Sequence, residues 1–254
     1  PILLVLPILF ADGVALPGGP PAPEAATPLR AIALAAAIVL AAWVAVRILL
    51  RGLDRTRRGI WLARADRALG LARLAILAAG AWSILSDGWL AWVRGAVGDL
   101  VLVDELLALA PVVAGLCGTW AVQQALETRV RDAMRLRRLD EGRPIWPTPS
   151  RPRFVVGQLR LQLGLLGVPI LLVLGLAEAA RMAVDAVGTA VPPWTADAAS
   201  LGAAALVFSL APLAMRLVLP IAPMPEGTVR DDMVSMCRRL GARVGDVMLW
   251  RTDG

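Results

Sequence analysis

Hydrophobic residues in this chain gather in long uninterrupted runs, which are separated by segments rich in arginine. The clearest run lies between Arg30 and Arg47, where residues 31–46 carry no charge. An α-helix needs about 20 apolar residues to cross a bilayer. The pattern predicts about five transmembrane spans, and these lie near residues 29–50, 68–89, 100–123, 161–177 and 198–219.

The first 28 residues precede these spans and have a different pattern. Residues 1–10 are mostly apolar, which is typical either of another span or of the hydrophobic part of a signal peptide. Residues 16–28 are rich in proline, glycine and alanine and have no helical period, so we interpret them as a linker. Because the chain begins at Pro1 and not at methionine, we expect its natural N-terminus to be missing.

After Pro225 the continuous hydrophobic pattern becomes periodic. Four apolar residues recur at helical spacing: Val229, Met233, Met236 and Leu240. Thr228 and Asp231 have the spacing of a capping box at the start of this helix, and Gly241 is suited to end it. Residues 247–252 alternate in character, which predicts a strand.

One helix and one strand cannot bury a hydrophobic core, and a lone strand would leave both of its hydrogen-bonding edges exposed. We therefore expect residues 220–254 to be the start of a truncated soluble α+β domain. The predicted fold is an all-α polytopic transmembrane bundle over residues 29–219, followed by the first helix and strand of that domain.

The composition agrees with a membrane protein and excludes several kinds of chemistry. Hydrophobic residues make up 58% and charged residues 18%, whereas soluble domains average about half and a quarter. Because the sequence has no histidine, a Ser-His-Asp triad and an imidazole zinc site are excluded. The two cysteines, Cys117 and Cys237, suggest no disulfide framework. No catalytic, cofactor-binding or metal-binding residue is predicted, and we expect the chain alone to be inactive and free of zinc.

The arginines alternate between the two sides of the predicted spans. Residues 51–67 contain six arginines, residues 129–160 contain nine, and residues 220–254 contain five, whereas each of the other two connections contains one, Arg94 or Arg181. The positive-inside rule therefore predicts an integral multi-pass protein, in a bacterial inner membrane, with its N-terminus outside and its C-terminus in the cytoplasm. The net charge of +6 reflects this orientation, so the expected partner is the lipid bilayer and not nucleic acid.

Some polar residues near the ends of the spans have two interpretations. Asp104 and Glu105 could form an outer cation site, although we favour interfacial residues at a helix start, where the helix dipole stabilises anions. Gln123 and Gln124 could line a polar path, although the headgroup region is their more natural place.

Two further features are weighed in the same way. The arginines within residues 129–138 could bind anionic lipid, but we favour the interpretation that they form a solvated positive face. Trp250 could form a platform for a substrate, and packing in a core is favoured.

The C-terminal segment resembles a known family. The resemblance rests on Arg239-Leu240-Gly241 followed by Asp246-Val247-Met248-Leu249-Trp250-Arg251-Thr252. It is similar to the beginning of the catalytic domain of the membrane zinc metallopeptidases that include the CAAX prenyl proteases and the HtpX-type heat-shock proteases. In that family a helix ending in Arg/Lys-Leu-Gly leads to a short strand that contains tryptophan. The resemblance covers about thirty residues.

The resemblance implies a parent protein that is a zinc metalloendopeptidase acting on membrane or membrane-proximal proteins at the cytoplasmic face. Its zinc would be held by an HExxH helix with a downstream glutamate, and neither histidine exists in this chain. The alternative functions are a membrane anchor or scaffold and a transporter-like protein. Transporters place ionisable groups near the bilayer midplane, and the middle of each predicted span is uncharged.

Overall fold

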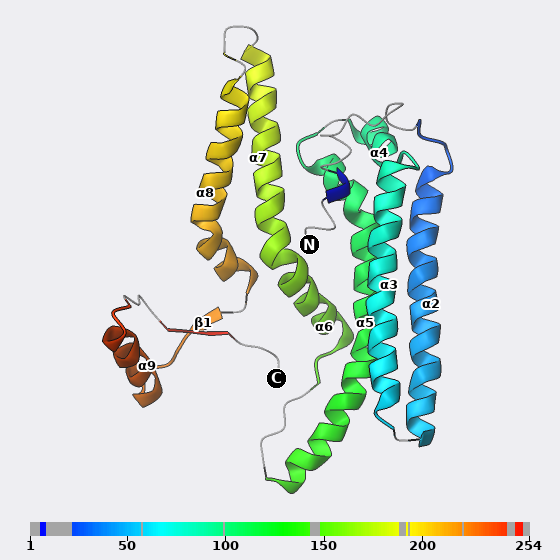
Figure 1. The fold of residues 1–254 in the computed structure, drawn as a ribbon, viewed down its shortest axis with the longest axis vertical. Coiled ribbons are helices and arrows are strands. Elements are labelled where there is room, and N and C mark those ends of the chain that lie inside the picture. The colour runs from blue at the N-terminus through cyan, green and yellow to red at the C-terminus, as the bar shows by residue number, and fades with distance from the viewer. Residues whose placement is uncertain are drawn as a thin grey trace.

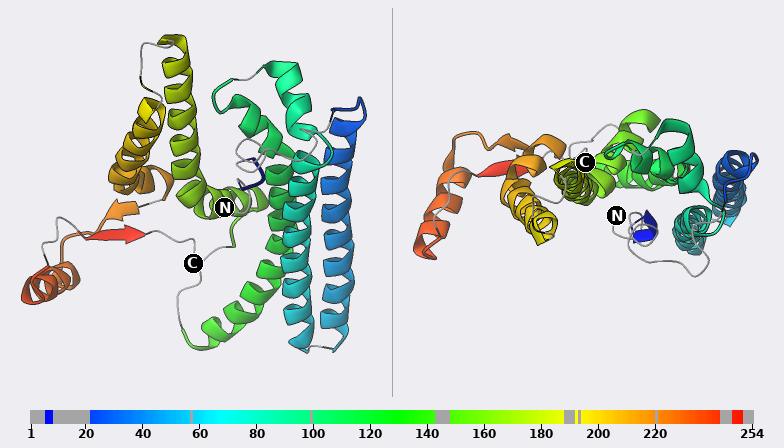
Figure 2. Two further views of the ribbon diagram at one scale, coloured as in Figure 1. Left: turned by 45° about the horizontal axis from the view of Figure 1, so that its top comes forward. Right: turned by 90° about the horizontal axis from the view of Figure 1, so that it is seen from above.

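The computed structural model is mostly helical. It describes residues 6–8, 22–56, 58–98, 100–142, 148–187, 192, 194–219, 221–242 and 247–250. Three long helices form a bundle (Figure 1): α2 (Thr27–Thr56), α3 (Ile60–Leu85) and α5 (Val103–Asp140). A second pair, α7 (Leu165–Val187) and α8 (Trp194–Val218), forms a hairpin beside the bundle, on the side away from α2 (Figure 2).

Within the described residues, four helices are long and apolar enough to cross a membrane: Thr27–Thr56, Ile60–Leu85, Val103–Asp132 and Gly167–Val184. They overlap four of the five predicted spans, with different bounds. In α8 the apolar stretch among the described residues is Leu201–Leu210, which is shorter than a span requires. The helical bundle of membrane type is thus confirmed, and the fifth span stays a prediction.

The arginine-rich connection between the first two spans is largely helical. Helix α2 continues to Thr56 and α3 already begins at Ile60, so the turn is much shorter than the segment 51–67 that separates the predicted spans. Arginine is a good helix former, so the arginine-rich segments can continue both helices. The arginine-rich ends of α2, α3 and α5 lie at one end of the molecule, opposite α4 and the C-terminal end of α7 (Figure 1).

The opposite end of the bundle differs from the expected loop. Helix α3 ends at Leu85, and a separate short helix, α4 (Trp89–Val97), follows. The break occurs at Gly88, whose φ of 69° lies in the left-handed region that glycine tolerates best. The predicted second span, 68–89, therefore corresponds to a helix that starts earlier and stops before Trp89.

The helix that leads into α7 changes its hydrogen-bonding pattern. It starts as α6 (Arg151–Gln158), becomes a π-helical segment, η1 (Leu159–Gly164), and continues as α7. Pro169 lies inside α7, where it cannot donate a backbone hydrogen bond. The π-helical segment, a local irregularity of the helix, ends shortly before this proline.

Close packing within the bundle depends on glycine. A Cβ atom at Gly118 of α5 would lie 2.8 Å from Val39 Cγ1 of α2, and one at Gly80 of α3 would collide with Val112 of α5. Small residues are the usual means by which membrane helices approach closely. Larger buried side chains, including Leu69, fill the remaining space between the three helices.

The C-terminal segment forms a small unit of two strands and one helix. Strands β1 (Ile221–Pro223) and β2 (Met248–Trp250) pair antiparallel, with Ile221 opposite Trp250, and α9 (Thr228–Arg239) connects them. The predicted helix and strand are confirmed. The expectation of a lone strand is wrong, because the proline-rich segment after α8 supplies a partner. Proline is tolerated in such an edge strand.

The two ends of α9 compare differently with the sequence. Gly241 takes a left-handed φ of 74°, and the Ala242 amide donates to the Cys237 carbonyl at 3.0 Å, as in a Schellman motif. The predicted capping box is not formed, because Gly227 occupies the N-cap position and makes no side-chain capping bond.

Candidate functional site

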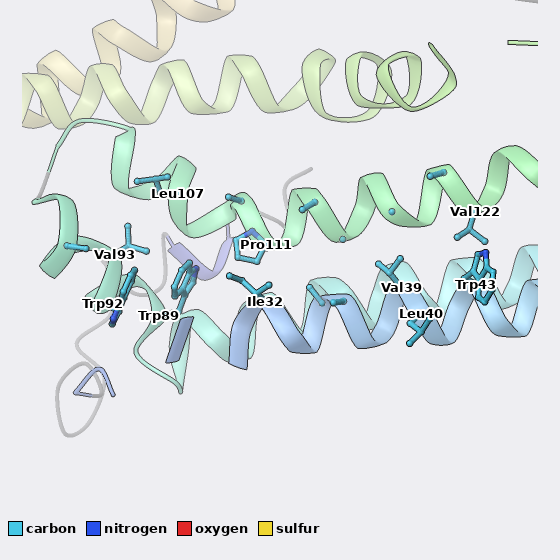
Figure 3. A pocket seen from close by; sticks show the side chains of 18 of the residues that line it. Ile32, Val39, Leu40, Trp43, Trp89, Trp92, Val93, Leu107, Pro111 and Val122 are labelled. Carbon is cyan, nitrogen blue, oxygen red and sulfur yellow. The ribbon is translucent and has the colours of Figure 1, made fainter. Parts of the chain in front are cut away.

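An apolar groove runs along α2 and α5 and has a volume of about 850 Å³. Ligand pockets in proteins typically measure about 300–1,000 Å³. Its larger lining side chains are labelled in Figure 3: Ile32, Val39, Leu40, Trp43, Trp89, Trp92, Val93, Leu107, Pro111 and Val122. Small residues, including Ala110, Ala114 and Gly118, form its α5 wall.

Helix α4 closes one end of the groove. The Trp89 indole donates a hydrogen bond to the Ala108 carbonyl at 2.9 Å, which fixes α4 on α5. Trp89 and Trp92 stack with their ring centroids 5.5 Å apart. The clustering of Trp82, Trp89 and Trp92 in the sequence is typical of an aromatic belt at a membrane interface. In the structure Trp89 is buried in the core, whereas Trp82 is 65% exposed.

A charged cluster lies beside α4, at the first turn of α5. Arg94 Nε is 2.7 Å from Asp104 Oδ2, and Arg94 Nη2 is 3.5 Å from Glu105 Oε1. Glu178 of α7 accepts a hydrogen bond from the Leu102 amide at 3.3 Å. Oxygen atoms of the three carboxylates lie within 4.8 Å of one another. The cluster therefore joins α4, α5 and α7.

The carboxylates of this cluster are more enclosed than an interfacial position implies. Asp104 is fully buried and Glu105 is 6% exposed. Each has one oxygen, Asp104 Oδ1 and Glu105 Oε2, without a hydrogen-bond partner. The sequence correctly places both residues at the start of a helix, but it misses Glu178, which is distant in sequence. Oxygen ligands suit hard cations, and Arg94 already supplies a positive charge at this position.

Gln123 and Gln124 do not act together. Arg73 Nη2 donates to Gln123 Oε1, whereas Gln124 Nε2 donates to the Pro149 carbonyl at 3.3 Å. Each amide therefore connects α5 to a different segment. These contacts favour a structural role and provide no polar path between the two side chains.

Within residues 129–138, the described arginines pair with carboxylates. Arg129 lies 2.6 Å from Asp54 of α2, and Arg131 lies 3.0 Å from Glu127, the i,i+4 pair that helical spacing favours. Arg135 lies 3.3 Å from Asp132. This region is thus partly neutralised. The backbone of Trp250 lies in β2, while its side chain is outside the described residues.

Both cysteines are free thiols, in agreement with the absence of a predicted disulfide framework. Comparison of the chain with protein-family models, with curated proteins and with solved structures gives no match.

Proposed function

We propose that this chain is the membrane portion of a zinc-dependent membrane metalloendopeptidase similar to the CAAX prenyl proteases and HtpX-type proteases. The observation that carries the proposal is the β1–α9–β2 unit directly after the last apolar helix. It has the helix–glycine–strand order on which the resemblance depends, with Gly241 ending the helix and Trp250 in the strand.

The exposed face of α9 supports a larger domain at this position. Its four periodic apolar residues are all exposed: Val229 55%, Met233 47%, Met236 62% and Leu240 79%. An amphipathic helix normally buries such a face against other elements. We propose that residues of the catalytic domain cover it, and that the fifth span, α8, holds the unit at the membrane surface.

In such an enzyme the metal activates a water molecule that attacks the peptide carbonyl. No residue of this chain is assigned to that step. The chain would anchor the catalytic domain at the cytoplasmic face of a bacterial inner membrane, close to membrane or membrane-proximal substrates.

The reading frame beyond the codon for Gly254 provides the sharpest test. We expect an HExxH sequence within about a hundred residues, because that helix supplies two zinc ligands and the general base. The longer product should contain stoichiometric zinc by elemental analysis and hydrolyse peptides, whereas residues 1–254 alone should do neither. A frame without HExxH would refute the proposal and leave a membrane anchor as the function.

The orientation has a separate test, single-cysteine labelling in a background with Cys117→Ser and Cys237→Ser. Arg58→Cys lies in the turn between α2 and α3, and Ser86→Cys lies after α3, at the opposite end of that helix. In intact cells, an impermeant thiol reagent should label Ser86→Cys and leave Arg58→Cys unmodified. The reverse pattern would overturn the cytoplasmic assignment of the arginine-rich end.

A further inference from the structure

The groove between α2 and α5 opens along a helix that is apolar enough to cross a membrane. Ile32, Leu40 and Trp43 line it and are 57%, 59% and 43% exposed. From Ile32 to Trp43 the helix rises roughly 16 Å, just over half of the hydrocarbon core of about 30 Å. An elongated apolar group that lies parallel to the helices therefore fits this groove (Figure 3).

The α2 wall of the groove continues into a row of arginines. Arg47, Arg51 and Arg55 follow Trp43 at successive intervals of four residues, so each is turned by about 40° from the one before and Arg47 lies nearest to the groove wall. All three are exposed. The Arg47 guanidinium lies over the Trp43 ring, 4.8 Å from its centroid. A cationic group thus stands where the apolar lining ends, at the end of the groove opposite α4.

These arginines differ from the arginines of α5. In the part of the chain that the structure describes, Arg47, Arg51 and Arg55 form no ion pair. The neighbouring carboxylate of Asp54 is bound by Arg129 at 2.6 Å. An anionic ligand at Arg47 would therefore meet unneutralised guanidinium groups, which suit phosphate because they offer parallel N–H donors.

We propose that this groove binds one anionic phospholipid, with an acyl chain between α2 and α5 and the phosphate at Arg47. The apolar lining of the groove binds the acyl chain, and the row of arginines favours a negatively charged head group. The stacked Trp89 and Trp92 close the α4 end of the groove and limit how deeply the acyl chain enters. This proposal stands independently of any peptidase activity.

Lipid binding to the purified full chain tests the proposal. The chain is delipidated in mild detergent and titrated with phosphatidylglycerol or phosphatidylethanolamine of identical acyl chains, and native mass spectrometry counts the bound lipids. We expect one tightly bound phosphatidylglycerol and no comparable binding of phosphatidylethanolamine. Glycerol phosphate, which lacks acyl chains, should not compete. Equal binding of both lipids, or full competition by glycerol phosphate, would overturn the proposal.

Two matched pairs of variants locate the site. Arg47→Gln should weaken phosphatidylglycerol binding about fivefold. Arg64→Gln is its control, because Arg64 also stacks on a tryptophan, Trp61, but lies outside the groove, and it should bind normally. Equal binding by these two variants would refute the assignment of the phosphate to Arg47.

The second pair of variants tests whether an acyl chain occupies the groove. Ala36→Phe places an aromatic ring into the groove and should abolish tight binding, whereas Ala37→Phe changes an exposed residue that is not part of the groove lining and should not. Both positions are exposed on α2, so neither substitution overfills the core. Unchanged binding by Ala36→Phe, or a dimer whose cross-links map to the groove, would show that an acyl chain is not the occupant.

Discussion

Helices α5 and α7 have apolar stretches of the same mean hydropathy, yet the molecule uses them differently. Half of the most apolar window of α5 is buried inside the protein, compared with 6% of that of α7. Helix α5 presents Gly115 to Ile76 of α3 and Gly118 to Val39 of α2, so two helices approach it closely. Hydropathy therefore identifies helices that suit a membrane, whereas the placement of small residues decides which one becomes central.

One contact between the α7–α8 hairpin and the bundle lies near the charged cluster. The Leu102 side chain packs directly against Gly175 of α7, and the Leu102 amide donates to Glu178, one turn further along. Leu102 has a φ of 62°, an uncommon value for a residue other than glycine. Ile170, Leu171 and Leu174 of α7 also pack against the buried core of the bundle, so this contact and an apolar face of α7 together position the hairpin.

The largest effect is expected from overfilling the bundle. Gly80→Leu would drive a side chain into Val112, and we expect it to lower the free energy of unfolding by about 3 kcal/mol. Thermal unfolding in mild detergent, followed by circular dichroism, measures the loss. Gly70→Leu is the control in the same helix, because a Cβ atom there meets nothing within 4 Å. If both variants were equally stable, close packing would not explain the order of the bundle.

The next effect concerns the charged cluster. Arg94→Gln removes the cation that pairs with Asp104 and Glu105 and leaves buried carboxylates without compensation. Because Arg94 is itself 30% exposed, we expect a loss of about 2 kcal/mol, less than for a fully buried pair. Adding Asp104→Asn should recover part of the stability, as measured by the same thermal unfolding. An additive further loss in the double variant would contradict the pairing.

A substitution at the hairpin should lower the stability less, but it should clearly change the position of the hairpin relative to the bundle. Gly175→Leu would displace Leu102 and cost about 1 kcal/mol or less, because the atoms nearest to the new side chain all belong to the Leu102 side chain, which can shift. Spin labels introduced in place of Trp82 and Met182, which are both exposed, should then show a broader distribution of label-to-label distances in double electron–electron resonance. Gly167→Leu, on the same helix and in open space, should leave the distribution unchanged. Identical distributions in the two variants would mean that other contacts hold the hairpin.

The sequence predicts the features that depend on neighbouring residues. Apolar runs identify the four long helices, and periodic apolar residues followed by Gly241 identify α9. It fails where distant segments meet. Glu178 reaches Leu102 across 76 residues, and β1 pairs with β2 from beyond α9. It also misses α4, because the role of Gly88 as a helix break depends on a backbone conformation that hydropathy does not report.

The smallest effect is expected at an exposed ion pair that also connects two helices of the bundle. Asp54 and Arg129 join α2 and α5 at 2.6 Å, and their side chains are 48% and 51% exposed. Solvent screens such a pair, so Asp54→Asn should cost about 0.5 kcal/mol at most, despite a distance as short as that of the Arg94–Asp104 pair. High salt should remove the small loss of stability caused by Asp54→Asn. Most of the loss caused by Arg94→Gln should remain, because burial protects the charged cluster from screening. Thermal unfolding of both variants at low and high ionic strength makes the comparison. Equal losses at the two sites would mean that enclosure at the α4 end contributes nothing to the strength of its ion pairs.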